Sequence, residues 1–311
     1  MGFEFWGFLG FWVLVIGHSP LIIPPVHFQK ITLIGVGLLG GSIGLAAKQR
    51  GVAARVCGLV RREESIAECL AAGVVDEATL DVANAVADAG LIILCTPVGQ
   101  MSELAAAIKP HLAADTIVTD VGSVKASVVT AVEPVLPRFV GSHPLCGSEK
   151  AGVIHARGDL LEGAVCAVTP TEVSDAAMVE TLSNFWTALG SRVVNLSAAN
   201  HDAIVARTSH LPHVLASALV NAVLAAPRAG ESDFFGTGFR DTTRLASGSP
   251  EMWRDITRDN SDAIIAALEG LQSEIDRLKT ALSEKDAAAL EEFFTEGQIA
   301  RDSWLADGEN K

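Results

Sequence analysis

The stretch Gly35-Val36-Gly37-Leu38-Leu39-Gly40 decides the fold, because it follows a short buried strand and opens a helix. The strand is expected at 31–34, in an apolar run that one threonine interrupts, and the helix at 39–50. A G-x-G-x-x-G motif alone is a weak signal, but in this strand-to-helix context it is typical of dinucleotide binding. A glycine turn that binds no ligand is the alternative interpretation.

Each position of this glycine motif has a physical task. Gly35 permits the tight turn, and Gly37 lets the backbone approach a pyrophosphate. Gly40 allows the helix to pack closely against the strand. The helix N-terminus at Leu38 and Leu39 offers backbone N–H groups and the positive end of the helix dipole to phosphate oxygens. We therefore predict that these five residues contact a dinucleotide.

Strands alternate with helices from the glycine motif to about residue 196. The strand-like runs are short and continuously apolar, which suits parallel strands covered on both faces. The predicted fold class is α/β: a Rossmann-type doubly wound parallel sheet, followed by an all-helical domain. The further strands are expected at 55–60, 91–95, 116–119, 165–168 and 192–194, and the further helices at 63–72 and 175–189.

After Ser197 the strand pattern disappears, and the sequence predicts helices only. The Ala-rich segment 200–226 is apolar, and its Pro212 is expected to kink or begin a helix. We divide the chain into an apolar N-terminal extension at 1–27, a dinucleotide-binding domain at 28–196 and a helical substrate and dimerisation domain at 197–311.

A narrow apolar seam marks the predicted long helix of the second domain. Its residues follow a 4-3-4-3-4 spacing, the pattern of a helix packed lengthwise against another helix. An ordinary core helix and a contact between two copies of the chain both fit this pattern. Ser283 is expected to cap a last helix at 284–304, with Asp286 in capping-box position. The seam consists of Ile264, Leu268, Leu271, Ile275, Leu278 and Leu282.

The first 25 residues are almost wholly apolar between Phe3 and Ile23, although glycines and prolines interrupt them. They lack the basic start and the cleavage site of a signal peptide. Three interpretations stay open: an extension from a misassigned start, a membrane anchor, or a segment packed on the protein. We do not expect a membrane partner.

The charge and the cysteines of the chain limit which partners and which cellular compartment are expected for it. With 37 acidic and 23 basic residues the formal net charge is −14, which repels nucleic acid and anionic membranes. An anionic substrate therefore needs a local cluster of cations. The five cysteines are odd in number and form no C-x-x-C pair. This usage predicts a reduced, cytoplasmic compartment without disulfides or a zinc knuckle.

The end of the second strand bears on the choice of cofactor. A site that prefers NAD carries Asp or Glu there to bind the ribose hydroxyls. Here Arg61 and Arg62 follow the strand, and no acid precedes Glu63. Two guanidinium groups at this place suit a 2′-phosphate, so we favour NADP over NAD. Solvated surface charges are the alternative.

Four polar clusters lie outside the glycine motif. Residues 120–125 follow a buried strand, at the carboxyl edge where doubly wound sheets bind ligands. Residues 139–144 place His143 at the end of another apolar run. The other two clusters, 209–213 and 239–244, belong to the helical domain.

The motifs of the chain and their order resemble those of the prephenate/arogenate (cyclohexadienyl) dehydrogenase family. After the glycine turn these motifs are D-x-x-S-x-K, H-P-L-C-G, S-H-L-P-H and F-R-D-T-T-R, followed by P-E-M-W. The resemblance runs from about Ile31 to Trp304. The chain departs from the family in its N-terminal extension and at Cys146, where the family often has alanine. The resemblance implies oxidative decarboxylation of prephenate or arogenate to 4-hydroxyphenylpyruvate or tyrosine, with hydride transfer to NAD(P), by a homodimer joined through the helical domain.

The implied chemistry gives roles to residues at the sheet edge. Oxidation of a secondary alcohol needs a base for the hydroxyl proton, and His143 has a suitable pKa range. Ser123 is expected to hydrogen-bond the same hydroxyl or the nicotinamide. Thr96, at the end of another strand, is expected to contact the cofactor, although an ordinary turn also explains it.

The implied substrate is a small dicarboxylate, which needs cations in this acidic chain. Arg244 is the best anchor, because a guanidinium grips a carboxylate with two parallel hydrogen bonds. Arg240, Ser209 and His213 are expected to support it. Arg240 pairing mainly with Asp241 is the alternative for that residue.

Residues in these clusters also suggest two other chemistries. His210 and His213 form an H-x-x-H pair, but no third ligand lies nearby and Pro212 interrupts the helix, so no metal is expected. Lys125 fits a catalytic lysine after the sheet, but a structural or surface role is favoured.

Two other functions also remain open. A β-hydroxyacid dehydrogenase combines a Rossmann domain with a helical domain, although the S-H-L-P-H and F-R-D-T-T-R motifs argue against it. A non-catalytic NADP-sensing module would bind cofactor without turnover. The sequence does not distinguish prephenate from arogenate, since no residue stands out as a partner for the ammonium group of arogenate.

Overall fold

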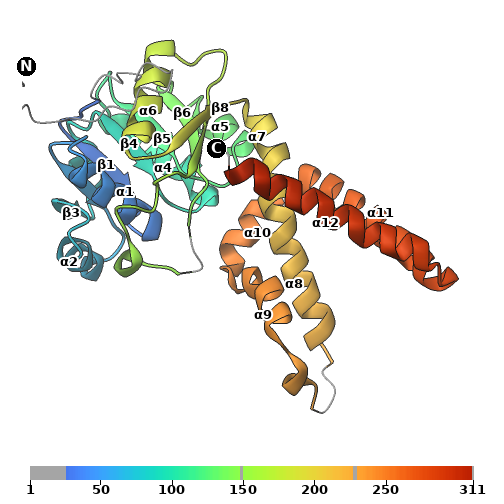
Figure 1. The fold of residues 1–311 in the computed structure, drawn as a ribbon. Helices are drawn as coiled ribbons and strands as arrows, with labels where there is room; N and C mark the ends of the chain where they lie inside the picture. Colours follow the sequence, from blue (N-terminus) through green and yellow to red (C-terminus); the bar gives the residue numbers. More distant parts are fainter. Residues whose placement is uncertain (1–25, 148–149, 227–229, 310–311) are drawn as a thin grey trace, which may run out of the picture.

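The computed structural model describes residues 26–147, 150–226 and 230–309, so the apolar segment at 1–25 lies outside the described residues. Its centre is an eight-stranded sheet in the order β3-β2-β1-β4-β5-β6-β7-β8 (Figure 1). The strands are β1 Ile31–Ile34, β2 Val56–Leu59, β3 Glu77–Thr79, β4 Leu91–Leu94, β5 Ile117–Asp120, β6 Phe139–Pro144, β7 Val165–Thr169 and β8 Arg192–Asn195.

Helices cover the sheet and then form the described chain after β8. The α-helices are α1 Leu38–Gln49, α2 Glu63–Ala71, α3 Val82–Val86, α4 Met101–Ile108, α5 Ala126–Val132, α6 Ala176–Ala188, α7 Ala198–Val205, α8 Leu211–Leu224, α9 Thr237–Thr243, α10 Pro250–Asp259, α11 Ser261–Glu284 and α12 Ala287–Glu309. The π-helix η4 spans Ala206–His210, and the 3-10 helices are η1 Val98–Gln100, η2 Lys109–His111, η3 Val153–His155, η5 Glu231–Phe234 and η6 Arg244–Ser247.

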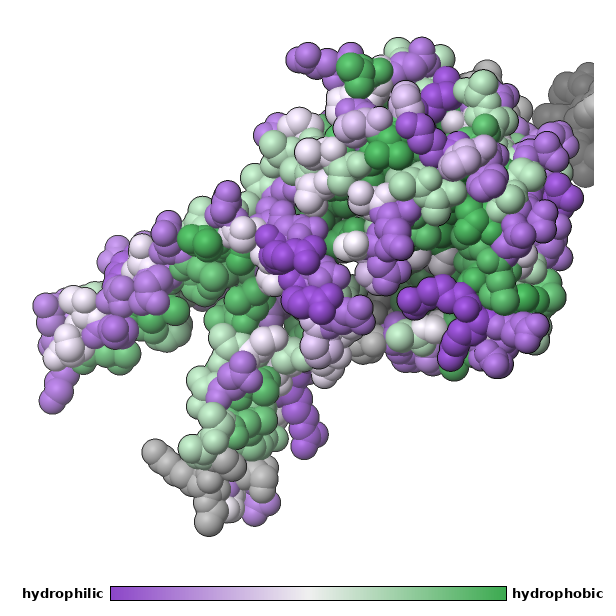
Figure 2. Space-filling view, turned by 180° about the vertical axis from the view of Figure 1, so that it is seen from behind, coloured by the Kyte–Doolittle hydropathy of each residue, from purple (hydrophilic) through white to green (hydrophobic). Residues whose placement is uncertain are grey.

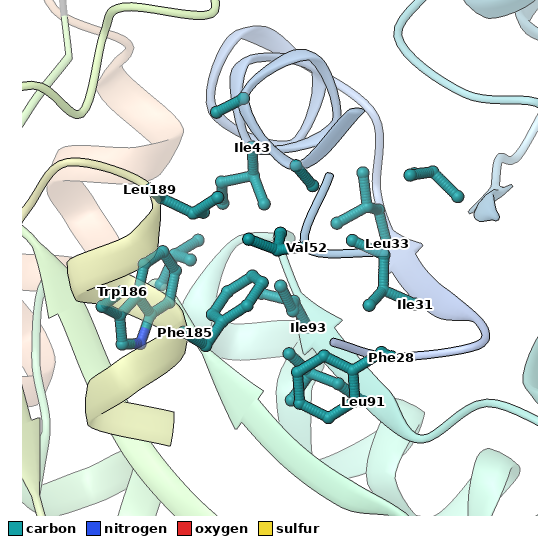
Figure 3. Packing of buried hydrophobic residues seen from close by; sticks show 14 of the residues in the cluster. Phe28, Ile31, Leu33, Ile43, Val52, Leu91, Ile93, Phe185, Trp186 and Leu189 are labelled. Carbon is teal, nitrogen blue, oxygen red and sulfur yellow. The ribbon is translucent and has the colours of Figure 1, made fainter. Parts of the chain in front are cut away.

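The central strands are buried on both faces, as their continuous apolar runs predict. Leu91 and Ile93 of β4 belong to one hydrophobic cluster, whereas Ile92 and Leu94 belong to a second cluster on the opposite face. Residues of α1 and α6 complete the first cluster (Figure 3), and residues of α3, α4 and α5 complete the second. Because successive side chains of a strand point to opposite faces, this division confirms a doubly wound sheet.

The far edge of the sheet differs from the predicted all-parallel arrangement. The strands from β3 to β6 pair in parallel, but β6 pairs with β7 in antiparallel fashion, and β8 continues parallel to β7. A parallel return needs a crossover, usually a helix. Between β6 and β7 the described chain holds only the 3-10 helix η3. The strand β3 was also not predicted.

The described chain after β8 is helical, which confirms the predicted helical region. Pro212 is the second residue of α8, which follows the π-helix η4 directly, so α7, η4 and α8 form one interrupted helix. The prediction for the last two helices was wrong at their junction. Ser283 lies inside α11 and donates to the Thr280 carbonyl, while Asp286 itself caps α12 by accepting from the backbone N–H groups of residues 288 and 289.

Two helix pairs project from the body of the molecule: α8 with α9, and α11 with α12 (Figure 1). The apolar seam of α11 becomes exposed along the projection, since Ile264 is 5% exposed and Leu282 is 56% exposed. Apolar side chains gather along both projections in the space-filling view (Figure 2). None of the helices in the described ranges combines the length and the apolar character that crossing a membrane requires.

Candidate active site

A cavity of about 850 Å³ lies between the carboxyl ends of the central strands and the helical region that follows β8. This is the edge where open α/β sheets bind ligands. From the sheet side it is lined by Thr96, Ser123 and His143, and from the helical side by Ser209, His213 and Arg244. These six predicted site residues, which lie up to 148 positions apart in the sequence, therefore share one space.

The glycine turn opens onto the same cavity, because Leu39 of α1 is one of its lining residues. Gly35 has a φ of +91°, and a Cβ there would lie 2.9 Å from the Cys95 carbonyl oxygen. A Cβ on Gly40 would collide with the Gly35 carbonyl oxygen. Gly37, in contrast, faces open space, with no atom within 4 Å of the place a Cβ would take. The turn thus has the tightness and the free approach that a pyrophosphate requires.

Two further features bear on the fit of a dinucleotide. The Thr96 hydroxyl oxygen is buried and has no hydrogen-bond partner within the described ranges, although buried polar groups are normally paired. A ligand in the cavity would supply that partner. Arg61 and Arg62 follow β2 with exposed side chains, at the N-terminus of α2. These residues fit a bound nicotinamide dinucleotide.

His143 lies on the sheet side of the cavity, near the end of β6, and is 9% exposed. Its Nδ1 lies 2.8 Å from the Nε2 of His201 in α7. The Nδ1 of His201 in turn lies 2.7 Å from the Asp202 carboxylate. Burial, followed by the neighbouring His201, Lys125 and His210, holds the pKa of His143 well below its usual value. His143 is therefore neutral near pH 7 and able to accept a proton.

A buried ion pair lies behind His143. The Lys125 ammonium contacts the Asp120 carboxylate, and both side chains have no exposed surface. The other Asp120 oxygen accepts from the backbone N–H of Ser142 at 3.1 Å. Lys125 is not among the residues that line the cavity. This position supports the structural role favoured for Lys125 over a catalytic one.

The helical side of the cavity is organised by Trp253 of α10. The His213 ring stacks on Trp253 with 4.0 Å between ring centroids, and its Nδ1 donates to the Ser209 carbonyl at 2.9 Å. His210 also lines the cavity, and burial lowers its pKa to about 4. Arg244 is exposed and reaches the cavity, whereas Arg240 is exposed on α9 and does not line it.

The sequence analysis did not single out His201, Asp202 or Asn260. The Asn260 amide Nδ2 donates to the Asp202 carbonyl at 2.9 Å and lies 3.1 Å from the Nδ1 of His210. A His-Asp dipeptide inside a helix has no recognisable motif, so no signal marked these residues in advance. Within the ranges that the structure describes, no group of three or more His, Cys, Asp or Glu side chains is arranged to hold a metal ion.

Comparison with known proteins gives consistent findings over both halves of the chain. Residues 43–195 match the family model "Prephenate dehydrogenase, nucleotide-binding domain", and residues 197–296 match "Prephenate dehydrogenase, dimerization domain". A prephenate dehydrogenase from Bacillus subtilis is 36% identical over 283 residues, covering 88% of this chain and 76% of the relative. A cyclohexadienyl dehydrogenase from Zymomonas mobilis is 34% identical, covering 88% of this chain and 95% of the relative.

A solved structure supports the same comparison. The crystal structure of prephenate dehydrogenase from A. aeolicus, in complex with hydroxyphenyl propionate and NAD+, superposes with a TM-score of 0.85. The two chains are 32% identical, and the match covers 89% of this chain and 99% of that chain.

Proposed function

Because the chain belongs to the prephenate dehydrogenase family, we propose that it catalyses the oxidative decarboxylation of prephenate or arogenate, in tyrosine biosynthesis. The products are 4-hydroxyphenylpyruvate and tyrosine, respectively. The single observation that carries this proposal is the composition of the cavity. It joins the glycine turn, a neutral buried histidine and a cluster of substrate-binding polar groups in one space.

His143 acts in this proposal as the base that takes the hydroxyl proton of the substrate. Its low pKa keeps it neutral, and the Nδ1 contact with His201 leaves Nε2 for the hydroxyl. Ser123, on the same wall of the cavity, hydrogen-bonds that hydroxyl or the nicotinamide. A nicotinamide dinucleotide held at the glycine turn would supply the hydride acceptor for oxidation of the ring carbon. Loss of carbon dioxide then makes the ring aromatic, so this step needs little help from the protein.

Substrate binding falls to the helical side of the cavity. Arg244 binds one carboxylate in a bidentate ion pair, and Ser209 and His213 add hydrogen bonds from α8 and the preceding π-helix. Arg240 is assigned a secondary role, because it does not line the cavity. The positive charge of Arg244 offsets locally the repulsion that a net charge of −14 exerts on a dicarboxylate.

A steady-state assay of prephenate and arogenate, each with NAD and with NADP, tests the function and identifies the preferred pair. Activity on at least one of the two substrates is expected. Simple β-hydroxyacids serve as the comparison, and a higher kcat/KM on these would assign the chain to the alternative dehydrogenase class. Cofactor binding without any turnover would instead support a silent sensing module.

The cofactor preference gives a sharper prediction. If Arg61 and Arg62 bind a 2′-phosphate, changing both to Ala should raise KM for NADP by about 10-fold or more, since losing even one hydrogen bond to a charged group costs about 1.5–3 kcal/mol. KM for NAD should change little, because NAD lacks that phosphate. A wild-type protein with clearly higher kcat/KM on NAD would contradict the preference.

The projecting helices support a homodimer joined through the helical domain. Exposed apolar residues lie on both helices of one pair: Ile275 and Leu282 on α11, and Phe294 and Ile299 on α12. Such an apolar surface marks an association site. We expect light scattering at micromolar concentration to give twice the chain mass, and Leu282→Glu with Phe294→Glu to give monomers. A stable wild-type monomer would contradict this prediction. A cytoplasmic location is proposed on the cysteine usage alone.

A further inference from the structure

A chain of hydrogen bonds leads from His143 away from the cavity and into the protein. It passes from the His143 Nδ1 to the His201 Nε2, and from the His201 Nδ1 to the Asp202 carboxylate. All three side chains are buried. They come from β6 and α7, which are 58 positions apart at the first contact.

Asp202, at the far end of these hydrogen bonds, determines which atom donates in each of them. The Asp202 carboxylate accepts hydrogen bonds from the backbone N–H groups of Lys125 at 2.7 Å and Ala126 at 2.8 Å. Burial alone would raise the pKa of Asp202, but the bonds from His201, Ala126 and Lys125 outweigh it and leave that pKa below its usual value. Asp202 is therefore an ionised carboxylate, which accepts hydrogen bonds and cannot donate them.

The tautomers of both histidines follow step by step. Since the carboxylate accepts, the His201 Nδ1 must carry the proton that it donates. A neutral His201 then has an unprotonated Nε2, which accepts from the His143 Nδ1. A neutral His143 that donates from Nδ1 has its lone pair on Nε2, the ring nitrogen left for a ligand in the cavity.

We propose that His201 and Asp202 are positioning residues that hold His143 in the tautomer with its basic Nε2 free for the substrate hydroxyl. Their arrangement follows the logic of a base that is oriented by a third group, with a second imidazole between base and carboxylate. The proposal rests on the proposed role of His143 as the base.

Asp202 also joins two parts of the site. Its carboxylate binds the backbone at Lys125 and Ala126, in the same loop that carries Ser123. One side chain thus holds the loop of Ser123 and, through His201, the ring of His143. When His143 takes a proton, the charge formed lies next to His201 and is balanced by Asp202. The other charged or titratable groups near the ring are His210 and Lys125, and Lys125 is paired with Asp120.

The test uses Asp202→Asn, with Asp175→Asn as the matched control. Asp175 also caps a helix by accepting a backbone N–H bond, from Met178 at 2.9 Å, but it lies on α6 outside the cavity. One Asp202 oxygen accepts from both the Lys125 N–H and the His201 Nδ1, and the other accepts from the Ala126 N–H. An Asn at 202 therefore places its NH2 group either against the Ala126 N–H or against the Lys125 N–H and the His201 Nδ1. The second arrangement reverses both tautomers and protonates the His143 Nε2.

For Asp202→Asn we expect kcat to fall about 10- to 100-fold, short of the roughly 10²–10⁴ expected for complete loss of a base. The KM of Asp202→Asn should stay near the wild-type value, and so should both kcat and KM of the Asp175→Asn control. In ¹⁵N-labelled protein the His143 signals should show a protonated Nδ1 in the wild type, and a protonated Nε2 in the fraction of the variant whose Asn NH2 group faces His201. The acid limb of the pH–rate profile should move as well.

A second variant keeps the test decisive if Asp202→Asn folds poorly. His201→Gln can place an accepting oxygen near the position of Nε2, whereas His201→Ala cannot, so Gln should retain several-fold more turnover than Ala. Equal turnover of Gln, Ala and wild type, or a wild-type His143 with its proton on Nε2, would overturn the proposal. The NMR result does not depend on activity. It therefore separates failure of this proposal from failure of His143 as the base, which His143→Asn kinetics decide.

Discussion

Replacing His143 by Asn is expected to lower kcat by about 10²–10⁴, the usual contribution of a positioned acid–base group. Asn keeps a hydrogen-bonding side chain of similar size, but it has no basic nitrogen to take the hydroxyl proton. KM should change much less, because Arg244 still binds a carboxylate. Steady-state kinetics with the preferred substrate measure both constants.

The pH dependence of the wild type gives the same prediction a second measurement. The base must be neutral to act, so the rate falls when acid protonates His143. Because its pKa is lowered, the rate should persist down through pH 6.5, the ordinary histidine value, and fall only below it. This limb should vanish in His143→Asn and remain in His111→Asn, a change at an exposed histidine. Near-normal turnover of His143→Asn would show that another group is the base.

Changing Arg244 to Ala is expected to raise KM by about 10- to 150-fold, because hydrogen bonds to charged groups contribute about 1.5–3 kcal/mol. The guanidinium binds the carboxylate in the ground state as well as in the transition state. Loss of such uniform binding raises KM and leaves kcat nearly unchanged. This pattern is the reverse of that expected for His143→Asn.

The control for Arg244 is Arg192→Ala, which removes an exposed arginine at the start of β8, on the far edge of the sheet. Its KM should equal that of the wild type. Arg240→Ala should fall between the two, since Arg240 is near Arg244 in the sequence but does not line the cavity. A kcat loss without a KM change in Arg244→Ala would assign this arginine to the chemical step instead.

The central fold could be predicted because its strands carry their own signal. Runs such as 91–94 are apolar at every position, and only burial on both faces explains that pattern. Strand β3 carries no such signal, since its three residues are half-buried and include Glu77. The antiparallel pairing of β6 with β7 was also out of reach, because it depends on the path of the intervening chain.

The site could be predicted in part, for a related reason. Residues within one motif, such as Ser209 and His213, are recognisable together because they are neighbours in the sequence. The chain from His143 to His201 and Asp202 forms only when β6 meets α7. Arg240 shows the converse limit, since its place in the motif did not bring it to the cavity.

The π-helix at 206–210 has a consequence for how this helical segment can change. Each residue of an α-helix turns the chain by about 100°, so one extra residue in the turn sets the rotational phase of everything that follows. His201 and Asp202 before it face the sheet, while Ser209 and His213 face the cavity. Shortening the turn by a single residue would rotate α8 away from Trp253. The number of residues between Asp202 and Ser209 is therefore constrained, because it sets how the groups that face the sheet and the groups that face the cavity are oriented relative to each other.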